Sequence, residues 1–148
     1  MKTVLIAYGS RTGNTENMAN YIAEGVRFSG NEATLKKVTE IKKDDQLKGY
    51  DAYIFGSPTY HKNMIGTMQQ FLFLAQKAGL EGRLAGAFGS STHSGEAPGI
   101  IFATMQYVLI MNIIDLGPLT LKEDMIKTQE GIKACQQYGN AIGDLLNQ

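Results

Sequence analysis

The sequence VLIAYGSRTGNT, residues 4–15, places a polar loop between an apolar run and the start of an amphipathic helical pattern. A short apolar run of this kind is typical of a parallel strand buried on both faces. Gly13 lets a ligand approach the backbone closely, and the start of the following helix directs free N–H groups at an anion. We therefore predict a phosphate-binding loop. Its residues are Ser10, Arg11, Thr12, Gly13, Asn14 and Thr15.

Glycine spacing limits which phosphate this loop can bind. Gly9 and Gly13 stand four residues apart, which matches neither the dinucleotide pattern GxGxxG nor the P-loop pattern GxxxxGK. No lysine follows Gly13 to reach the outer phosphates of a nucleotide. A terminal phosphate monoester therefore fits better than a nucleoside triphosphate. Helix capping without any ligand is the alternative interpretation, because Ser, Thr, Asn and Gly also occur at helix starts and turns.

Composition and charge exclude several classes of protein. The 148 residues include 14 Lys plus Arg and 14 Asp plus Glu, so no basic field favours nucleic acid or an anionic membrane. The single cysteine, Cys135, cannot form an internal disulfide. The apolar stretches are too short for a bilayer span or a signal peptide. We expect a soluble cytoplasmic protein with one domain, residues 1–148, and no nucleic-acid or membrane partner.

Apolar runs alternate with helical patterns along the whole chain. Central strands are predicted at Val4–Ala7, Ala52–Phe55 and Leu84–Phe88, and edge strands at Ala33–Val38 and Ile113–Leu121. Apolar stripes with helical spacing lie at residues 19–26, 68–75 and 132–146, and a further helical segment, residues 100–110, is apolar on nearly all sides. Strands that alternate with helices predict an α/β fold, in which a doubly wound parallel sheet carries helices on both faces.

Such a sheet binds ligands beyond the carboxyl ends of its strands, where the strand order reverses. Three predicted loops lie there, at Gly9–Thr15, Ser57–Met64 and Gly89–Gly99. The second loop reads SPTYHKNM and the third GSSTHSGEAPG, so both are polar and both contain an aromatic or imidazole ring. A phosphate loop beside two ring-bearing loops predicts a site for a phosphorylated planar ring.

With these loops the sequence resembles the flavodoxin family over essentially its whole length, and SRTGNT is the most specific match. The resemblance implies a five-stranded parallel sheet in the order 2-1-3-4-5 and a non-covalently bound FMN. It also implies an electron carrier whose partners are redox proteins. The sequence SGEA at Ser94–Ala97 is similar to the flavodoxin domain of flavodiiron proteins. An aromatic residue often precedes SGE in those domains, and His93 takes its place here.

The resemblance assigns cofactor contacts to all three loops. Tyr60 stands where the family places an aromatic residue against the isoalloxazine ring, whereas contact of His61, Lys62 and His93 with the flavin stays open. For Arg11, a position in solvent is the alternative to phosphate contact. The complete predicted set is Ser10, Arg11, Thr12, Gly13, Asn14, Thr15, Ser57, Pro58, Thr59, Tyr60, His61, Lys62, Asn63, Ser90, Ser91, Thr92, His93, Ser94, Gly95 and Glu96.

Two departures from the family bear on the reduction potential. A small residue, commonly glycine, follows the stacking aromatic in the family and allows a peptide flip, whereas this chain has His61. A bulky residue adopts positive φ reluctantly, so we expect the flip to cost more. Typical flavodoxins are strongly acidic, whereas this chain has no net charge and places Lys62 next to the ring position. We therefore expect a potential less negative than that of a typical flavodoxin.

Three classes of function are compared. An electron carrier needs an exposed flavin edge and no substrate pocket, and we expect this function, with no catalytic residue, no metal and a monomeric state. The alternative is an FMN-dependent NAD(P)H:quinone-type reductase, in which His61, Lys62 and His93 orient an anionic donor, although no insertion builds a donor site. A regulatory receiver module needs an acidic pair after the first strand, and Gly9-Ser10-Arg11 offers none.

Overall fold

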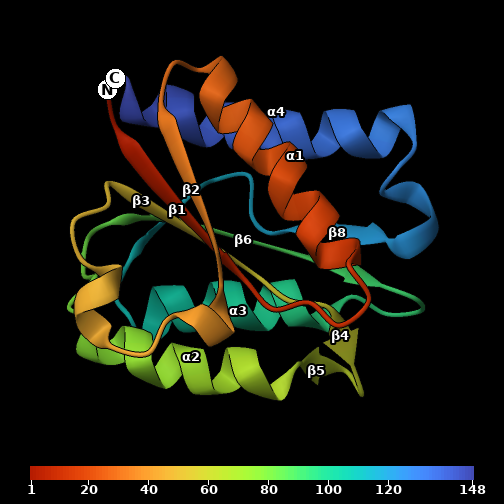
Figure 1. Ribbon diagram of the computed structural model, residues 1–148, viewed down its shortest axis with the longest axis horizontal. Helices are drawn as coiled ribbons and strands as arrows, with labels where there is room; N and C mark the ends of the chain where they lie inside the picture. The colour runs from red at the N-terminus through yellow and green to blue at the C-terminus, as the bar shows by residue number, and fades with distance from the viewer.

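Strand β1 (Thr3–Tyr8) runs through the middle of the sheet in the computed structural model, which describes residues 1–148 (Figure 1). It pairs in parallel with β2 (Glu32–Lys37) on one side and with β3 (Ala52–Gly56) on the other. The next strand outward from β3 is β6 (Leu84–Ser91), again parallel. The predicted α/β fold with a parallel central sheet is confirmed.

The fifth position of the sheet holds two short strands instead of one. Strand β7 (Asn112–Ile113) pairs with the beginning of β6, and β8 (Leu119–Lys122) pairs with its end, both in parallel. Gly117 lies between them in the left-handed region, with φ 75°, and Pro118 has no N–H to donate. The predicted edge strand is therefore split at the point where the sequence interrupts it.

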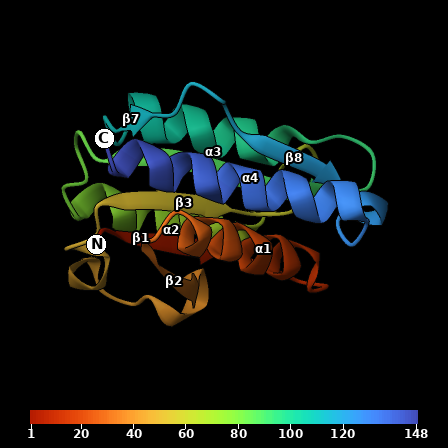
Figure 2. The same ribbon diagram turned by 90° about the horizontal axis from the view of Figure 1, so that it is seen from above.

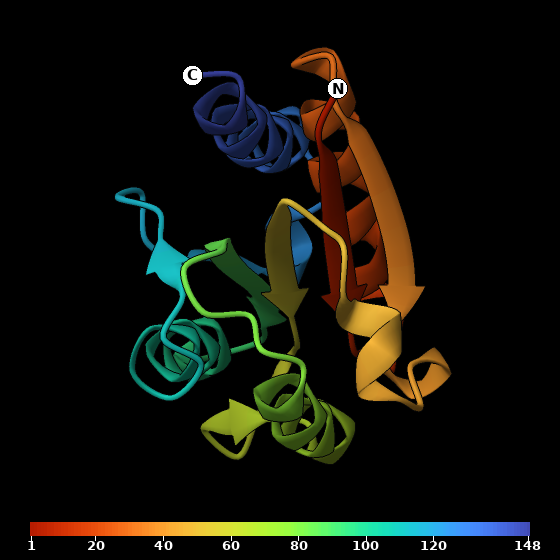
Figure 3. The ribbon, with the colours of Figure 1, turned by 90° about the vertical axis from the view of Figure 1, so that its left-hand side faces the viewer.

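Four helices cover the two faces of the sheet. Helices α1 (Asn14–Phe28) and α4 (Gln129–Leu146) lie side by side on one face, with α4 nearer the β7–β8 edge (Figure 2). Helices α2 (Gly66–Lys77) and α3 (Glu96–Tyr107) cover the opposite face (Figure 3). Short 3₁₀ turns occur at Val38–Glu40, Asp44–Leu47 and Glu123–Met125. None of the helices has both the length and the apolar character that crossing a bilayer requires.

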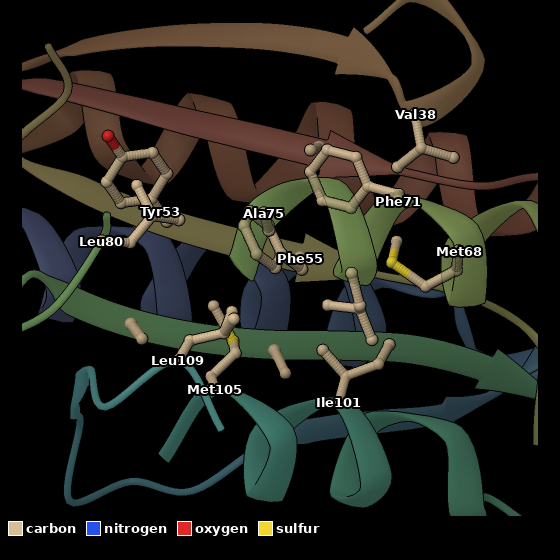
Figure 4. Packing of buried hydrophobic residues seen from close by; sticks show 14 of the residues in the cluster. Val38, Tyr53, Phe55, Met68, Phe71, Ala75, Leu80, Ile101, Met105 and Leu109 are labelled. Carbon is tan, nitrogen blue, oxygen red and sulfur yellow. The ribbon is translucent and has the colours of Figure 1, made fainter. Parts of the chain in front are cut away.

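Side chains of β1 alternate between two hydrophobic cores, as the period of two of a strand requires. Leu5 and Ala7 enter the core under α2 and α3, whereas Val4 and Ile6 enter the core under α1 and α4. In the first core, the rings of Phe55 and Phe71 meet edge to face, 4.9 Å apart (Figure 4). Both faces of the central strands are thus buried, which explains their continuous apolar runs.

Helices α1 and α4 pack against each other at glycines. A Cβ atom on Gly139 would collide with the carbonyl oxygen of Ile22, and one on Gly25 would collide with that of Gln136. Only residues without a side chain allow the two helix backbones to come this close. This close approach fixes the C-terminal half of α1 against α4.

Candidate functional site

The first loop connects the end of β1 to the start of α1. Gly13 caps the helix with φ 91°, a left-handed conformation that glycine adopts without strain. The Ser10 hydroxyl accepts a hydrogen bond from the Gly13 N–H at 3.1 Å, which closes the turn. A Cβ atom on Gly13 would meet nothing within 4 Å, so the space in front of the loop is open.

Free backbone donors lie at the start of α1. The N–H of Asn17 donates to the Gly13 carbonyl at 3.0 Å, whereas the N–H groups of Asn14, Thr15 and Glu16 make no backbone hydrogen bond. No side chain caps the helix start. These unpaired N–H groups, together with the helix dipole, favour an anion at this position.

The second loop forms a small β-hairpin, which the sequence did not predict. Strand β4 (Thr59–Tyr60) pairs in antiparallel with β5 (Asn63–Met64), so His61 and Lys62 alone form the turn. Both turn residues have positive φ, 52° and 62°, which is the geometry of a type I′ turn. Such turns favour Asn-Gly, so a histidine and a lysine hold the hairpin tip in a strained conformation.

Ser57 supports this hairpin from inside the protein. Its buried hydroxyl donates to the Pro58 carbonyl at 2.9 Å and accepts from the Ile65 N–H at 3.1 Å. At the other end of the second loop, Asn63 is exposed and its side-chain carbonyl accepts from the Met64 N–H at 2.8 Å. The hydroxyl of Ser57 is therefore engaged in holding the loop.

The third loop begins later than predicted. Ser90 and Ser91 belong to strand β6, where Ser91 pairs with Lys122 of β8. The exposed part of the loop consists of Thr92, His93 and Ser94. Gly95 then precedes α3 with no room for a side chain, because a Cβ atom there would collide with Thr120.

Glu96, the first residue of α3, has an unusual environment. One of its carboxylate oxygens, Oε1, is buried and has no hydrogen-bond partner in the protein. A buried carboxylate oxygen without a partner loses its interaction with water and gains nothing in return. An N–H group of a bound ligand would remove this penalty.

Two hydrogen bonds tie the third loop to the other loops. The hydroxyls of Thr15 and Ser90 are 2.9 Å apart and buried, which connects the first loop to the third. The Thr59 hydroxyl accepts a hydrogen bond from the Ala97 N–H at 3.0 Å, which connects the second loop to the third. The predicted loops therefore converge at one end of the sheet, where Figure 1 shows the hairpin beside the start of α1.

A cation–π contact connects the first loop to the second. The guanidinium carbon of Arg11 lies 5.1 Å from the centroid of the Tyr60 ring. This distance is within the range of a favourable cation–π interaction. Arg11 is exposed, but its guanidinium group contacts the Tyr60 ring. The Tyr60 side chain is half-buried.

The predicted site residues thus fall into two groups. The buried members support the loops from inside: Thr15, Ser57, Pro58, Thr59, Ser90 and Ser91. The members that are exposed or partly exposed are Ser10, Arg11, Thr12, Gly13, Asn14, Tyr60, His61, Lys62, Asn63, Thr92, His93, Ser94, Gly95 and Glu96. Burial thus separates the predicted residues into a buried and an accessible group, and their contact with a cofactor stays a prediction.

A cavity of about 460 Å³ lies on the other side of Ser10 and Arg11, between the ends of β1 and β2 and the start of α2. Its walls include Tyr8 and Lys37, neither of which belongs to the predicted set. Burial and the nearby carboxylate of Glu16 raise the pKa of Tyr8 to about 12, so this phenol stays protonated at neutral pH. The cavity adjoins the phosphate loop but does not reach the second or third loop.

The chain matches a known family model and a curated relative. A family model described as a flavodoxin domain matches residues 5–103, which include all three loops. A protein of Archaeoglobus fulgidus named "NAD(P)H dehydrogenase (quinone)" is 31% identical in an alignment of length 122, and the match covers 66% of this chain and 64% of that protein. The chain thus spans slightly less than two thirds of the length of this relative.

Solved structures resemble the whole chain. A flavodoxin from the domain Archaea has a TM-score of 0.86 and 26% identity, with 99% of each chain covered. A flavodiiron core from Synechocystis has a TM-score of 0.85 and 25% identity, covering 99% of this chain and 36% of the other. The strand order, the three converging loops and the match over residues 5–103 agree, and this chain belongs to the flavodoxin family.

Proposed function

We propose that this chain carries electrons on a non-covalently bound FMN, between redox partner proteins. FMN is the cofactor of the flavodoxin family. The observation that carries the proposal is the convergence of the three loops, tied by the Thr15–Ser90 and Thr59–Ala97 contacts. When bound, FMN takes up and releases electrons, while the protein sets the potential at which it does so.

The phosphate end of FMN fits the first loop. The hydroxyls of Ser10 and Thr12 and the free N–H groups at the start of α1 are the donors that a phosphate monoester accepts from. Three or four charge-assisted hydrogen bonds contribute about 5–12 kcal/mol gross, against about 8 kcal/mol for micromolar binding. Association costs consume part of this gain, so the ring must contribute as well.

The ring end of FMN fits the second and third loops. Tyr60 supplies an aromatic surface at the rim, and the unpartnered Oε1 of Glu96 is an acceptor for a ring N–H. His61, Lys62 and His93 are exposed around this part of the site, where they can exclude water or change the local charge. We assign Tyr60, His61, Lys62, His93 and Glu96 to ring binding and the accessible residues of the first loop to phosphate binding. The buried residues of the predicted set support the loops.

The charge near the ring favours a potential less negative than that of acidic flavodoxins. Lys62 is exposed at the hairpin tip, and the chain as a whole has no net charge. A positive charge stabilises the reduced, more negative form of a nearby cofactor. The type I′ turn also holds His61 and Lys62 at positive φ, so a backbone rearrangement there starts from a strained conformation.

A reductase that passes hydride from NAD(P)H to a quinone is the second candidate. The resemblance to the Archaeoglobus relative with that name supports it, although this chain covers only 64% of that protein. As a carrier, the chain would act as one domain in the cytoplasm. The free and buried Cys135 agrees with such a reducing compartment.

An absorption spectrum of the purified protein, followed by stepwise reduction with dithionite and then by addition of NADPH or NADH, tests the two candidates. The carrier proposal requires a flavin spectrum, reduction by dithionite and slow reaction with either nicotinamide. Fast oxidation of NADPH or NADH with turnover of a quinone would establish the reductase instead. Absence of flavin binding would contradict both candidates.

Thr12→Asp tests the phosphate loop, because a carboxylate beside the phosphate repels it. We expect FMN affinity, measured by quenching of flavin fluorescence, to fall at least about 100-fold, the equivalent of about 3 kcal/mol. Thr39→Asp is the matched control: Thr39 is exposed near this loop but outside it, so affinity should change little. Equal effects of the two variants would remove the first loop from the proposal.

Lys62→Glu tests the influence of the hairpin charge on the potential. We expect the reduction potential, measured by equilibration with a reference dye, to become more negative by tens of millivolts. Lys133→Glu, which makes the same change at an exposed position of α4, should leave the potential unchanged. An unchanged potential in Lys62→Glu would show that the hairpin charge lies too far from the cofactor to matter.

A further inference from the structure

The outer surface of α2 and α3 carries an unusual set of exposed apolar side chains. Of nine large apolar residues that are exposed in the protein, five lie on α3, on α2 or just after α3. They are Phe73, Ile100, Tyr107, Val108 and Ile110. We call this surface the α2–α3 face. Phe73 and Tyr107 are 71% and 72% exposed, and the only charged residues of the two helices are Lys77 and Glu96. Apolar patches of this kind mark interaction surfaces.

A groove divides this face. It has a volume of about 320 Å³ and runs between α2 and α3, which lie side by side in Figure 3. Phe73, Ile100 and Val108 are among its five apolar lining residues, and the neutral side chains of Gln69, Gln76 and Thr104 are among its polar ones. Tyr107 is not part of the lining but lies beside it in the sequence, next to Val108. The face therefore presents both a projecting aromatic ring and a groove.

The residue Ile110, just after α3, has an unusual backbone conformation. It follows α3 with φ 54°, where the N–H of Met111 reaches back to the Met105 carbonyl at 2.9 Å. Glycine or asparagine is favoured at this position of a helix end, and a β-branched residue there is strained. The side chain is 58% exposed, so packing within this chain does not compensate for the strain. An apolar residue that is both strained and exposed indicates a contact with another molecule.

We propose that the α2–α3 face is the interface of a symmetric homodimer, in which Tyr107 of each copy enters the groove of the other. A twofold interface requires complementary features on one surface, and this face carries both. The five apolar side chains are between 37% and 72% exposed. Together with the neutral groove residues they contribute toward the roughly 800 Å² per partner that a stable interface buries. The absence of net charge on the chain removes long-range repulsion between two copies.

Sedimentation of the FMN-loaded protein from about 1 to 100 μM tests this proposal. We expect a species of twice the 16.2 kDa chain mass at the upper end of this range. Phe73→Asp and Tyr107→Asp should each raise the dissociation constant of the dimer at least about 100-fold, because each buries a charge in an apolar interface. Phe28→Asp is the matched control, since Phe28 is 67% exposed at the end of α1, away from this face.

Ile110→Gly separates an interface role from a structural one. Relief of the backbone strain should raise the melting temperature of the monomer at low concentration, while loss of the side chain weakens the dimer. A structural role alone would not produce these opposite effects. A monomer at every concentration, or a dimer that survives both aspartate variants, would overturn the proposal. A monomeric parent in which Phe73→Asp slows electron transfer to a redox protein would also overturn it and assign the face to that protein.

Discussion

The two helical layers of this protein are built in different ways. Helices α1 and α4 touch backbone to backbone at Gly25 and Gly139, and their outer surfaces carry charged side chains. Helices α2 and α3 are separated by a groove and expose apolar side chains. The first layer exposes two large apolar side chains, Phe28 and Leu145, whereas the second layer and the residues just after α3 expose five.

Backbone strain follows the same division. The three residues other than glycine with positive φ are His61, Lys62 and Ile110. The first two precede α2 and the third follows α3, whereas no such residue adjoins α1 or α4. Strained residues persist where function or binding requires them. The layer of α1 and α4 is therefore closely packed and free of such strain, whereas the layer of α2 and α3 is flanked by all three strained residues.

The largest change in stability is expected from alanine substitutions at glycines in the two helical layers. In Gly139→Ala the new methyl group meets the Ile22 carbonyl, so the helices must move apart, and we expect a loss of about 3 kcal/mol in the free energy of unfolding. In Gly99→Ala on α3 the new methyl group meets nothing within 4 Å, and the variant should gain about 0.5–1 kcal/mol. Urea denaturation measures both. A similar loss in the two variants would contradict the difference in packing.

A smaller change in the free energy of unfolding is expected at alkaline pH, because a thiol in the core under α1 and α4 ionises there. Burial raises the pKa of Cys135 from 9.0 to about 12. Because the thiol loses its proton more readily in the unfolded chain, its contribution to stability is complete below about pH 9 and is lost as the pH rises toward 12. We expect the free energy of unfolding to fall by about 2–3 kcal/mol between about pH 9 and pH 11.

Cys135→Ala checks the source of this pH dependence. The variant removes the titrating thiol from the same buried position, so the loss of stability above about pH 9 should become smaller. Part of it should remain, because Tyr8 in the same core also has a pKa raised to about 12. An identical pH profile in the variant and the parent would show that the thiol does not contribute.

The sequence predicted most of what periodicity controls. The central strands and the stripe that contains Cys135, Gly139 and Ile142 are buried as predicted, because side-chain direction repeats regularly in strands and helices. The convergence of the three loops could also be predicted, since the carboxyl ends of parallel strands meet at one edge. Strand β6 extends beyond the predicted Phe88, because pairing with β8 overrides the turn preference of Gly89-Ser90-Ser91.

Partners of individual side chains could not be predicted in this way. Ser57 and Thr12 both carry a hydroxyl group. Ser57 is buried and its hydroxyl makes two hydrogen bonds to nearby backbone groups, whereas Thr12 is exposed. The orphaned oxygen of Glu96 and the groove between α2 and α3 depend on tertiary packing and leave no pattern in the sequence. Residue type identified candidates, and only the structure separated supporting residues from accessible ones.

The smallest effect is expected at the tip of the β4–β5 hairpin. Replacing His61-Lys62 by Asn-Gly keeps the type I′ turn and relieves the strain of the two side chains. Part of this gain is offset by the greater freedom of glycine in the unfolded chain, so we expect the apoprotein to gain about 1 kcal/mol. Thermal unfolding measures it, and Asn63→Ala, adjacent to the turn but outside it, is the control. A loss of stability in the Asn-Gly variant would mean that His61 and Lys62 make contacts worth more than the strain they impose.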